Sequence, residues 1–491
     1  MRRRPQIGAV MRRARMVGVV VVLLALSMPV VAGAAAPRIV GGVEATPRIV
    51  GGVEAGPDEF PFLVGLVYSY EPSVFQGQFC GGTLIDPEWV LTAGHCVDGE
   101  IAEGIDVYAG SYDLDGGGKR IAVDEIYQHP GYDPNSQEND VALLHLAKPV
   151  KGADAVNGTA RLAIGSDRDL FPPGTNVITA GWGNTESDPA GTPEWPERVR
   201  KVELPIVSDA SCNDVYAGFM APGMICAGFE IGGADSCQGD SGGPLMIAYG
   251  DGTYLQLGVV SWGEGCADPG YPGVYALVIP YTCWIAETMG NGTLGYGRAY
   301  SAGTEGDDHF MGTSGTDIFL GQGGDDTIEG GNGSDVLCGG PGADTIIGGS
   351  GSDTIDGGDG ADEIKGGAGD DYLLGGRGDD YLAGNKDVDG MLGGPGADVL
   401  KGGSGDDALS GEADADTLIG RSGADALSGG TGADLLKGNG GGDRLGGGPQ
   451  DDVLGGGRGD DELRGGSGDD DLNGGAGYDV CDGETTRACE A

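Results

Sequence analysis

Two patterns of hydrophobic and polar positions divide the chain near residue 300. Before that point, short apolar runs such as 61–68 and 141–146 alternate with turns rich in Gly, Pro and Asp. This alternation predicts an all-β domain built from short strands. Residues 281–289 contain no Gly or Pro, and we expect a helix there that closes the domain.

After residue 302 the chain repeats with a period of nine residues. Asp recurs at every ninth position from 308 to 479, 20 times without a slip, and the second residue after each Asp is always apolar. Glycine stands two residues before each of these Asp residues, except where Asp387, Asp414 and Gln450 replace it. Repetition without insertions indicates one structural unit stacked on itself, so we predict a solenoid.

The N-terminal residues follow a third pattern. Six arginines within residues 2–15 precede an apolar run at 17–32 and three alanines at 34–36. This order is typical of a signal peptide, which we place at residues 1–36, and the run is short for a membrane span. We expect no membrane span after signal cleavage. The ten cysteines fit the oxidising environment of a secreted protein.

The charge balance excludes one class of partner. Acidic residues number 76 against 28 basic ones, which gives a formal net charge of −48. Binding to a phosphate backbone needs a basic surface, so we expect no nucleic-acid partner. The 103 glycines lack a strict three-residue period, which excludes collagen.

Three short motifs of the first domain carry catalytic chemistry. They are Leu-Thr-Ala-Gly-His-Cys at 91–96, Asn-Asp-Val-Ala-Leu-Leu at 139–144 and Gly-Asp-Ser-Gly-Gly-Pro at 239–244. A serine hydroxyl becomes a nucleophile when a base takes its proton and a carboxylate orients that base. His95, Asp140 and Ser241 supply these three groups. The backbone N–H groups of Gly239 and Ser241 are candidates for binding a developing oxyanion.

Residues 49–290 resemble the trypsin-like serine proteases, on the strength of these motifs. The resemblance implies two six-stranded antiparallel β-barrels with the site in the cleft between them. It also implies activation by cleavage before an Ile-Val-Gly-Gly terminus, whose new ammonium group pairs with Asp240. The precursor is then expected to be nearly inactive.

The sequence Pro-Arg-Ile-Val-Gly-Gly-Val-Glu-Ala occurs twice, at 37–45 and 47–55. Cleavage is therefore conceivable at Arg38-Ile39 or at Arg48-Ile49. The second copy has the family's spacing to the first strand, whereas the first copy would leave ten surplus residues. We expect cleavage between Arg48 and Ile49, with a propeptide at residues 37–48.

Substrate preference follows from the same resemblance. Asp235 lies six residues before Ser241, where the trypsin branch carries a carboxylate at the floor of its specificity pocket. Gly263 and Gly273 match wall positions that leave room for a long side chain, and Ser261 and Trp262 belong to the same wall. These residues imply cleavage after Arg or Lys, because a buried carboxylate favours a cationic partner.

Disulfides are also implied by the resemblance. The expected pairs are Cys80–Cys96, Cys212–Cys226 and Cys237–Cys266. Cys481 and Cys489 are close enough in sequence to form a small loop. The pairing of Cys283 and Cys338 stays open.

Residues 303–482 resemble the RTX (haemolysin-type) calcium-binding repeats, in which two nonapeptides form one turn of a parallel β-roll. Residues 303–491 hold 41 acidic and 10 basic residues, so we expect them to be disordered without Ca²⁺ and to fold as it binds. We expect weak or empty sites near Asp387, Asp414 and Gln450. The predicted calcium ligands are Asp308, Asp317, Asp326, Asp335, Asp344, Asp353, Asp362, Asp371, Asp380, Asp398, Asp407, Asp425, Asp434, Asp461 and Asp470.

The complete prediction is an all-β, secreted endopeptidase made as a zymogen. A linker at 291–302 joins its protease domain to the calcium-dependent β-roll solenoid, and a tail follows at 483–491. Its partners are protein or peptide substrates, calcium ions that the chemical step does not require, and, left open, a cell-surface ligand. The alternatives are a calcium-dependent surface-binding or adhesive protein with a vestigial protease domain, and a roll that serves only secretion and folding.

Overall fold

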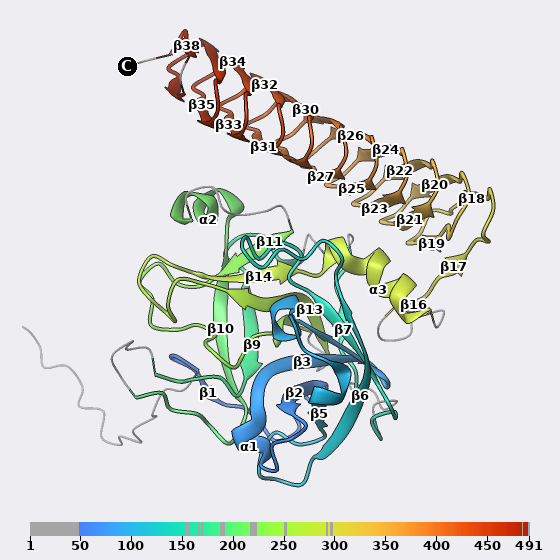
Figure 1. Ribbon diagram of the computed structural model, residues 1–491, viewed down its shortest axis with the longest axis vertical. Helices are drawn as coiled ribbons and strands as arrows, with labels where there is room; N and C mark the ends of the chain where they lie inside the picture. Colours follow the sequence, from blue (N-terminus) through green and yellow to red (C-terminus); the bar gives the residue numbers. More distant parts are fainter. Residues whose placement is uncertain are drawn as a thin grey trace, which may run out of the picture. The chain divides into compact units, whose positions relative to one another are not determined.

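A computed structural model describes most of the chain from Ile49 onward. The described residues are 49–152, 158–164, 167, 170–186, 192–216, 223–249, 253–290, 293–294, 298–483 and 485–489. The predicted signal peptide, the predicted propeptide and Arg48 lie outside them. Figure 1 shows the described part as two kinds of β-structure, barrels coloured blue to yellow-green and a stack of strands coloured yellow to red.

The first barrel is closed by six antiparallel strands. Its strand order is β2-β3-β4-β7-β6-β5. Its interior is filled by apolar side chains such as Leu66, Val90 and Val107, which are fully buried. The strands are β2 (Leu63–Tyr68), β3 (Gln78–Asp86), β4 (Trp89–Thr92), β5 (Ile105–Ala109), β6 (Lys119–Gln128) and β7 (Ala142–Leu146).

The second barrel closes in the same way, because β9 pairs with both β10 and β12. Its six strands are β9 (Asn176–Gly181), β10 (Arg200–Val207), β11 (Met224–Ala227), β12 (Pro244–Ala248), β13 (Tyr254–Trp262) and β14 (Gly273–Leu277). Two short strands join its margin, β1 (Val53–Glu54) on β10 and β8 (Arg161–Leu162) on β13. The predicted pair of six-stranded antiparallel barrels is confirmed.

Helices are few and short. They are α1 (Val74–Gly77), α2 (Asp209–Val215) and α3 (Thr282–Met289), with 3₁₀ turns η1 (Gly94–Cys96), η2 (Ala102–Gly104) and η4 (Ile279–Tyr281). The expected helix at 281–289 is α3, which ends at Gly290 in a left-handed conformation, φ 57°. No helix in the described part of the chain is both long and apolar enough to span a membrane.

The nonapeptides form a parallel β-roll of two sheets with eleven strands each. Successive nonapeptides alternate between the sheets, so equivalent strands pair with a shift of 18 residues, as in Ile346↔Ile364. The apolar residue two positions after each Asp points inward, and from Phe319 to Leu472 these side chains form one continuous buried core. The predicted solenoid is confirmed.

We call the two sheets of the roll sheet E and sheet F. Sheet E consists of β17 (Ser301–Ala302), β19 (Ile318–Leu320), β21 (Val336–Pro341), β23 (Thr354–Asp359), β25 (Tyr372–Arg377), β27 (Gly390–Pro395), β29 (Ala408–Ala413), β31 (Ala426–Thr431), β33 (Arg444–Pro449), β35 (Glu462–Ser467) and β37 (Val480–Asp482). Sheet F consists of β18 (His309–Met311), β20 (Thr327–Asn332), β22 (Thr345–Ser350), β24 (Glu363–Ala368), β26 (Tyr381–Lys386), β28 (Val399–Ser404), β30 (Thr417–Ser422), β32 (Leu435–Gly440), β34 (Val453–Arg458), β36 (Asp471–Ala476) and β38 (Thr485–Arg487).

The ends of the roll differ from the sequence prediction. The predicted linker contains a small hairpin, β15 (Thr293–Leu294) with β16 (Arg298–Ala299), and then β17, the first strand of sheet E. The predicted tail contains β38, which pairs with β36. β17 and β38 do not carry the nonapeptide motif. They join the sheets through backbone pairing with β19 and β36.

Candidate active site

His95 and Asp140 are brought together by two paired strands. β4 pairs with β7 so that Thr92 lies opposite Ala142, which places the η1 turn beside the residues that precede β7. The N–H of His95 donates to Oδ1 of Asp140 at 2.7 Å, and Nδ1 of His95 lies 2.8 Å from Oδ2. The Ser261 hydroxyl donates to the same Oδ2 at 2.5 Å. Asp140 is fully buried, so these contacts fix both its position and the imidazole plane.

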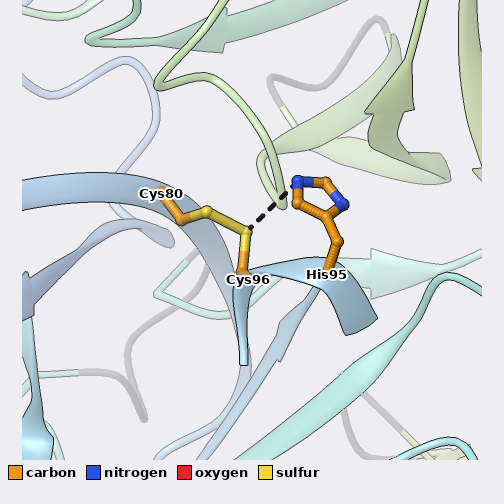
Figure 2. Close-up of side chains that lie close together, drawn as sticks. All are labelled: Cys80, His95 and Cys96. Carbon is orange, nitrogen blue, oxygen red and sulfur yellow. Dashed lines mark hydrogen bonds between the residues drawn. A yellow bond between two sulfur atoms is a disulfide. The ribbon is translucent and has the colours of Figure 1, made fainter. Parts of the chain in front are cut away.

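A disulfide lies next to His95 and restrains its loop. Cys96 follows His95 directly and is bonded to Cys80, and its Sγ lies 3.8 Å from Nε2 of His95 (Figure 2). Both sulfurs are consumed by the disulfide, so this group of three side chains cannot act as a thiolate metal site. It restrains the loop that carries the imidazole.

Ser241 lies in the tight turn before β12. The N–H of Gly81 donates to the carbonyl of Ser241 at 2.7 Å, which ties the turn to the first barrel. Gly242, at φ 79°, sits so close to Thr92 and Gly81 that any side chain would collide with them. The serine turn therefore packs against the end of β4, three residues before His95. The described residues contain no hydrogen bond between the Ser241 hydroxyl and the His95 imidazole.

The amides of Gly239 and Ser241 have no acceptor among the described residues. Among the hydrogen bonds of the described residues, none uses the N–H of Gly239 or of Ser241. The Gly239 carbonyl is held by the Gln78 side-chain amide at 2.9 Å, and a methyl group on Gly239 would collide with the Trp195 ring. Gln78 and Trp195 thus fix the position of Gly239. Neither was a candidate from the sequence, because no local motif marks a contact 161 residues away.

Asp235 is buried beside Gly273. Its side chain accepts the N–H groups of Ser236 at 2.8 Å and of Ala267 at 3.3 Å. A methyl group on Gly273 would stand 2.6 Å from its carboxylate, and Gly263 lies beside Gly273. Burial raises the pKa of Asp235 to about 7, and no cation among the described residues pairs with it.

The other predicted wall residues fall in the same region. Trp262 stacks edge to face on Tyr216, with ring centroids 4.8 Å apart. Ser261 is buried and donates its hydroxyl to Asp140, so the end of β13 contacts the His95–Asp140 pair.

Ile49 and Asp240 occupy neighbouring parts of the second barrel's loops. Ile49 is fully buried, and the carbonyl of Val50 accepts the N–H of Asp235 at 3.1 Å. Asp240 accepts the N–H groups of Gly183 at 2.7 Å and Cys237 at 3.0 Å. Burial raises its pKa to about 7, because no charged partner offsets the loss of hydration.

The three implied disulfides are present, Cys80–Cys96, Cys212–Cys226 and Cys237–Cys266. Cys481 also pairs with Cys489. Cys283 of α3 pairs with Cys338 of β21, a bond the sequence left open, and no cysteine is free.

Regularly spaced carboxylates line the roll. In each coil one oxygen, Oδ1, accepts the backbone N–H of the equivalent Asp 18 residues earlier, for example Asp335 N–H to Asp353 at 2.8 Å. The other oxygen, Oδ2, is buried without a hydrogen-bond partner in every repeat Asp from Asp326 to Asp479. Burial raises the pKa of Asp353 to about 7 and of Asp371 to about 9. Unpaired buried carboxylate oxygens of this kind need a cation.

Main-chain carbonyl oxygens lie close to Oδ2 of the repeat Asp residues in most coils. The residue five before each Asp is always glycine, and a methyl group there would collide with Oδ2 and, in most coils, with a glycine carbonyl of the next coil. At Gly348, for example, the Gly366 carbonyl lies 2.8 Å from that methyl position. Carboxylate and carbonyl oxygens are the ligands that Ca²⁺ prefers, so the residues fit the ion.

The first two nonapeptides differ from the others. Thr304 donates its N–H to Oδ2 of Asp308 at 2.6 Å, and Thr313 does the same for Asp317 at 2.6 Å. These two predicted ligands therefore have partners within the protein. The residues beside the lost glycines, Asp389, Asp416 and Asp452, have the same unpaired oxygen as their neighbours, so the geometry does not set them apart.

Comparison with known proteins agrees with both halves of this description. A profile of the trypsin family matches residues 49–285, and one for the RTX calcium-binding nonapeptide repeat matches six segments between 302 and 481. Cationic trypsin-3 of Rattus norvegicus is 39% identical over 224 residues, 45% of this chain and 84% of the relative. Trypsin-1 of Astacus astacus is 41% identical over 234 residues, 46% of this chain and 94% of the relative.

Two closed antiparallel barrels that bring a serine turn against a His–Asp pair define a serine protease domain. The chain belongs to the trypsin family, and RTX calcium-binding repeats follow its protease domain.

Proposed function

We propose that this chain is a secreted endopeptidase that is made as a zymogen and hydrolyses peptide bonds after Arg or Lys. The observation that carries the proposal is the buried Asp235 carboxylate, which lies beside Gly273 and has no cationic partner among the described residues. A guanidinium or ammonium group that reaches Asp235 supplies that partner.

In the proposed mechanism, the Ser241 hydroxyl attacks the scissile carbonyl while Nε2 of His95 takes its proton. Asp140 holds Nδ1 of His95 and stabilises the imidazolium that forms. The free N–H groups of Gly239 and Ser241 bind the oxyanion of the tetrahedral intermediate. His95 then gives the proton to the leaving amine, and water hydrolyses the acyl-enzyme by the same steps.

Activation is proposed to occur by cleavage between Arg48 and Ile49. In the described structure Ile49 has φ 45°, a region that β-branched residues rarely adopt. Cleavage removes the preceding carbonyl and with it this restraint. It also creates an ammonium group that can neutralise Asp240, which is otherwise a buried carboxylate without a cation.

Export and calcium binding complete the proposal. All ten cysteines are paired, which supports an extracellular protein, and RTX repeats imply that the roll binds calcium. We propose Oδ2 of the repeat Asp residues from Asp326 to Asp479 as ligands, with the adjacent glycine carbonyls. The ions are proposed to fold the roll, with no part in the chemical step.

The test uses protein that begins at Ile49 and three peptides that differ only in Arg, Lys or Phe before the scissile bond. Rapid cleavage of the Arg and Lys peptides, slow cleavage of the Phe peptide and none by Ser241→Ala are expected. A disulfide-bonded protein that cleaves none of them would favour a calcium-dependent binding protein with a vestigial protease domain. Equal cleavage of all three would leave the protease but contradict the Arg/Lys preference.

A further inference from the structure

The outward face of sheet E changes character along the roll. The residues that flank each inward apolar side chain point outward, because side chains alternate along a strand. Apart from Cys338, which forms a disulfide, and the partly buried Leu374, five of these outward residues in β19 to β27 are apolar, and each of the five is at most 8% exposed. We call them the docking face: Ile318, Leu320, Val336, Tyr372 and Leu392. From β29 to β35 the equivalent positions carry small or polar residues, among them Ala408, Ser410, Ser428, Arg444 and Arg464.

The protease domain covers the docking face. Ile318, Leu320 and Val336 belong to the same buried cluster as α3, and Tyr372 and Leu392 belong to the cluster that contains Ile279 of η4. The Cys283–Cys338 disulfide joins α3 to the strand that carries Val336. Covalent and apolar contacts thus hold the two folds together.

The docking face also reaches the segment that precedes the catalytic aspartate. Leu392 and Glu412 of the roll line one cavity together with Gln137, Glu138 and Asn139 of the protease domain. The next residue is Asp140. Gln137 and Asn139 both have positive φ, 59° and 52°, so this segment is held in a conformation that local preference does not favour.

We propose that calcium binding to the roll stabilises the protease domain through the docking face and restrains the segment 133–139 next to Asp140. The face is assembled by stacking of coils, and the coils carry buried carboxylates that oppose stacking until a cation neutralises them. Calcium therefore creates the surface on which the protease domain rests. By linkage, docking must in turn raise the calcium affinity of the roll. The proposal depends on calcium folding the roll and not on the Arg/Lys preference.

Tryptophan fluorescence can isolate the response of the protease domain. All five tryptophans lie before residue 290, at 89, 182, 195, 262 and 284. In the full chain from Ile49 with Ser241→Ala, the thermal midpoint seen by fluorescence is expected to rise by about 5 °C or more between chelator and saturating calcium. A midpoint that does not depend on calcium in this protein would overturn the proposal.

Two consecutive nonapeptides provide a matched pair of variants. Tyr372 and Tyr381 occupy the same repeat position, but Tyr372 lies in the docking face, whereas Tyr381 lies on sheet F with Lys401 4.4 Å above its ring. Tyr372→Ala is expected to lose at least half of the calcium-dependent shift, and Tyr381→Ala to keep it. Equal losses in both variants would contradict the proposal.

A second variant in the docking face distinguishes loss of docking from misfolding of the roll. Leu392→Lys places in β27 the residue that β28 carries at the equivalent position, Lys401, so the coil itself tolerates the side chain. Calcium-induced folding, followed by far-UV circular dichroism, is expected to persist in Leu392→Lys while the fluorescence shift is lost. Hydrogen exchange of segment 133–139 is expected to slow with calcium in the parent protein and not in Leu392→Lys. Calcium protection of the segment that survives in Leu392→Lys would refute the link to Asp140.

Discussion

At the scale of single residues, the proposed substrate preference depends on Asp235. Asp235→Asn keeps the size of the side chain but removes its charge and replaces one of its two acceptor oxygens with an NH₂ donor. Loss of one partner from a buried charge pair lowers kcat/KM for an Arg peptide by about 10²–10³-fold. The matched Phe peptide should change little. Steady-state kinetics on both peptides checks this, and an equal loss on both would contradict the assigned role.

The pKa of Asp235 makes binding of cations pH-dependent. Burial raises this pKa to about 7, and only the ionised carboxylate attracts a cation. Affinity for benzamidinium, a small cation that stays charged, should therefore be constant above pH 8 and fall toward tenfold per pH unit below pH 6. Calorimetry on Ser241→Ala measures it without interference from turnover. A dissociation constant that does not change between pH 5 and 8 would show that the carboxylate is ionised throughout.

Local motifs supplied the main candidate residues of the site. His95, Asp140 and Ser241 each stand in a short recognisable segment, and the structure brings His95 into contact with Asp140 and the serine turn against β4. The contributions of Gln78 and Trp195 could not be predicted. Both act on Gly239 through contacts that only the closed barrels create, and neither residue type carries a signal of its own.

At the scale of the repeating element, the proposed calcium sites need a glycine five residues before each Asp. Gly456→Ala would place a methyl group against Oδ2 of Asp461 and the Gly474 carbonyl. We expect it to destabilise the calcium-bound roll by about 1–3 kcal/mol, the usual range for overpacking. A calcium titration followed by circular dichroism would show a higher midpoint.

The adjacent glycine supplies the control for this prediction. The nearest atom to a methyl group on Gly455 is the Leu436 carbonyl oxygen at 4.0 Å, so Gly455→Ala should stay within about 0.5 kcal/mol of the parent protein. If both variants shift the calcium midpoint equally, glycine matters in the roll only for chain flexibility, and the assigned cradle is wrong.

The period of nine predicted a solenoid, and the resemblance to RTX repeats implied the parallel β-roll with its inward apolar side chains. It did not predict the two ends. β17 and β38 lack the motif and join the sheets through backbone hydrogen bonds alone. The period also did not predict that Oδ2 of Asp308 and Asp317 has a hydrogen-bond partner within the protein. The partners are the N–H groups of Thr304 and Thr313.

At the scale of the whole molecule, the proposed activation would couple the new N-terminus at Ile49 to the active site. Arg48→Gln blocks the proposed cleavage, and its precursor should be at least about 10²-fold less active, the cost of a disordered oxyanion site. An assay before and after exposure to an Arg-specific protease checks this. Full activity in uncleaved Arg48→Gln would contradict activation at this bond.

The proposed cleavage between Arg48 and Ile49 should also change how the stability of the folded protein depends on pH. In the uncleaved chain the pKa of Asp240 is raised to about 7 from 3.8, so the folded state binds the proton more tightly than the unfolded state. Stability contributed by this group is therefore present at low pH and is lost as the pH rises toward 7. Cleaved protein should not lose it, because the ammonium group keeps the carboxylate charged. Thermal midpoints of Ser241→Ala before and after cleavage, at pH 5 and 8, measure the difference, and equal pH profiles would argue against the ion pair.

The association of the two folds could not be read from the sequence. The residues of the docking face occupy repeat positions where other coils carry Thr, Lys or Ser, and apolar residues are common on exposed sheet faces. Only the burial of Tyr372 and Leu392 together with residues of the protease domain distinguishes them. The Cys283–Cys338 bond was open for the same reason, since one cysteine lies in each fold.

The central claim is that Ser241 is a nucleophile activated by His95 once the chain begins at Ile49. An alkylphosphonyl fluoride tests it directly, because the serine oxygen forms a bond to phosphorus and fluoride leaves. Mass spectrometry is predicted to find one adduct, on the peptide that contains Ser241, and none in the uncleaved precursor or in His95→Ala. Labelling elsewhere, or equal labelling of Ser241 in all three proteins, would contradict the account.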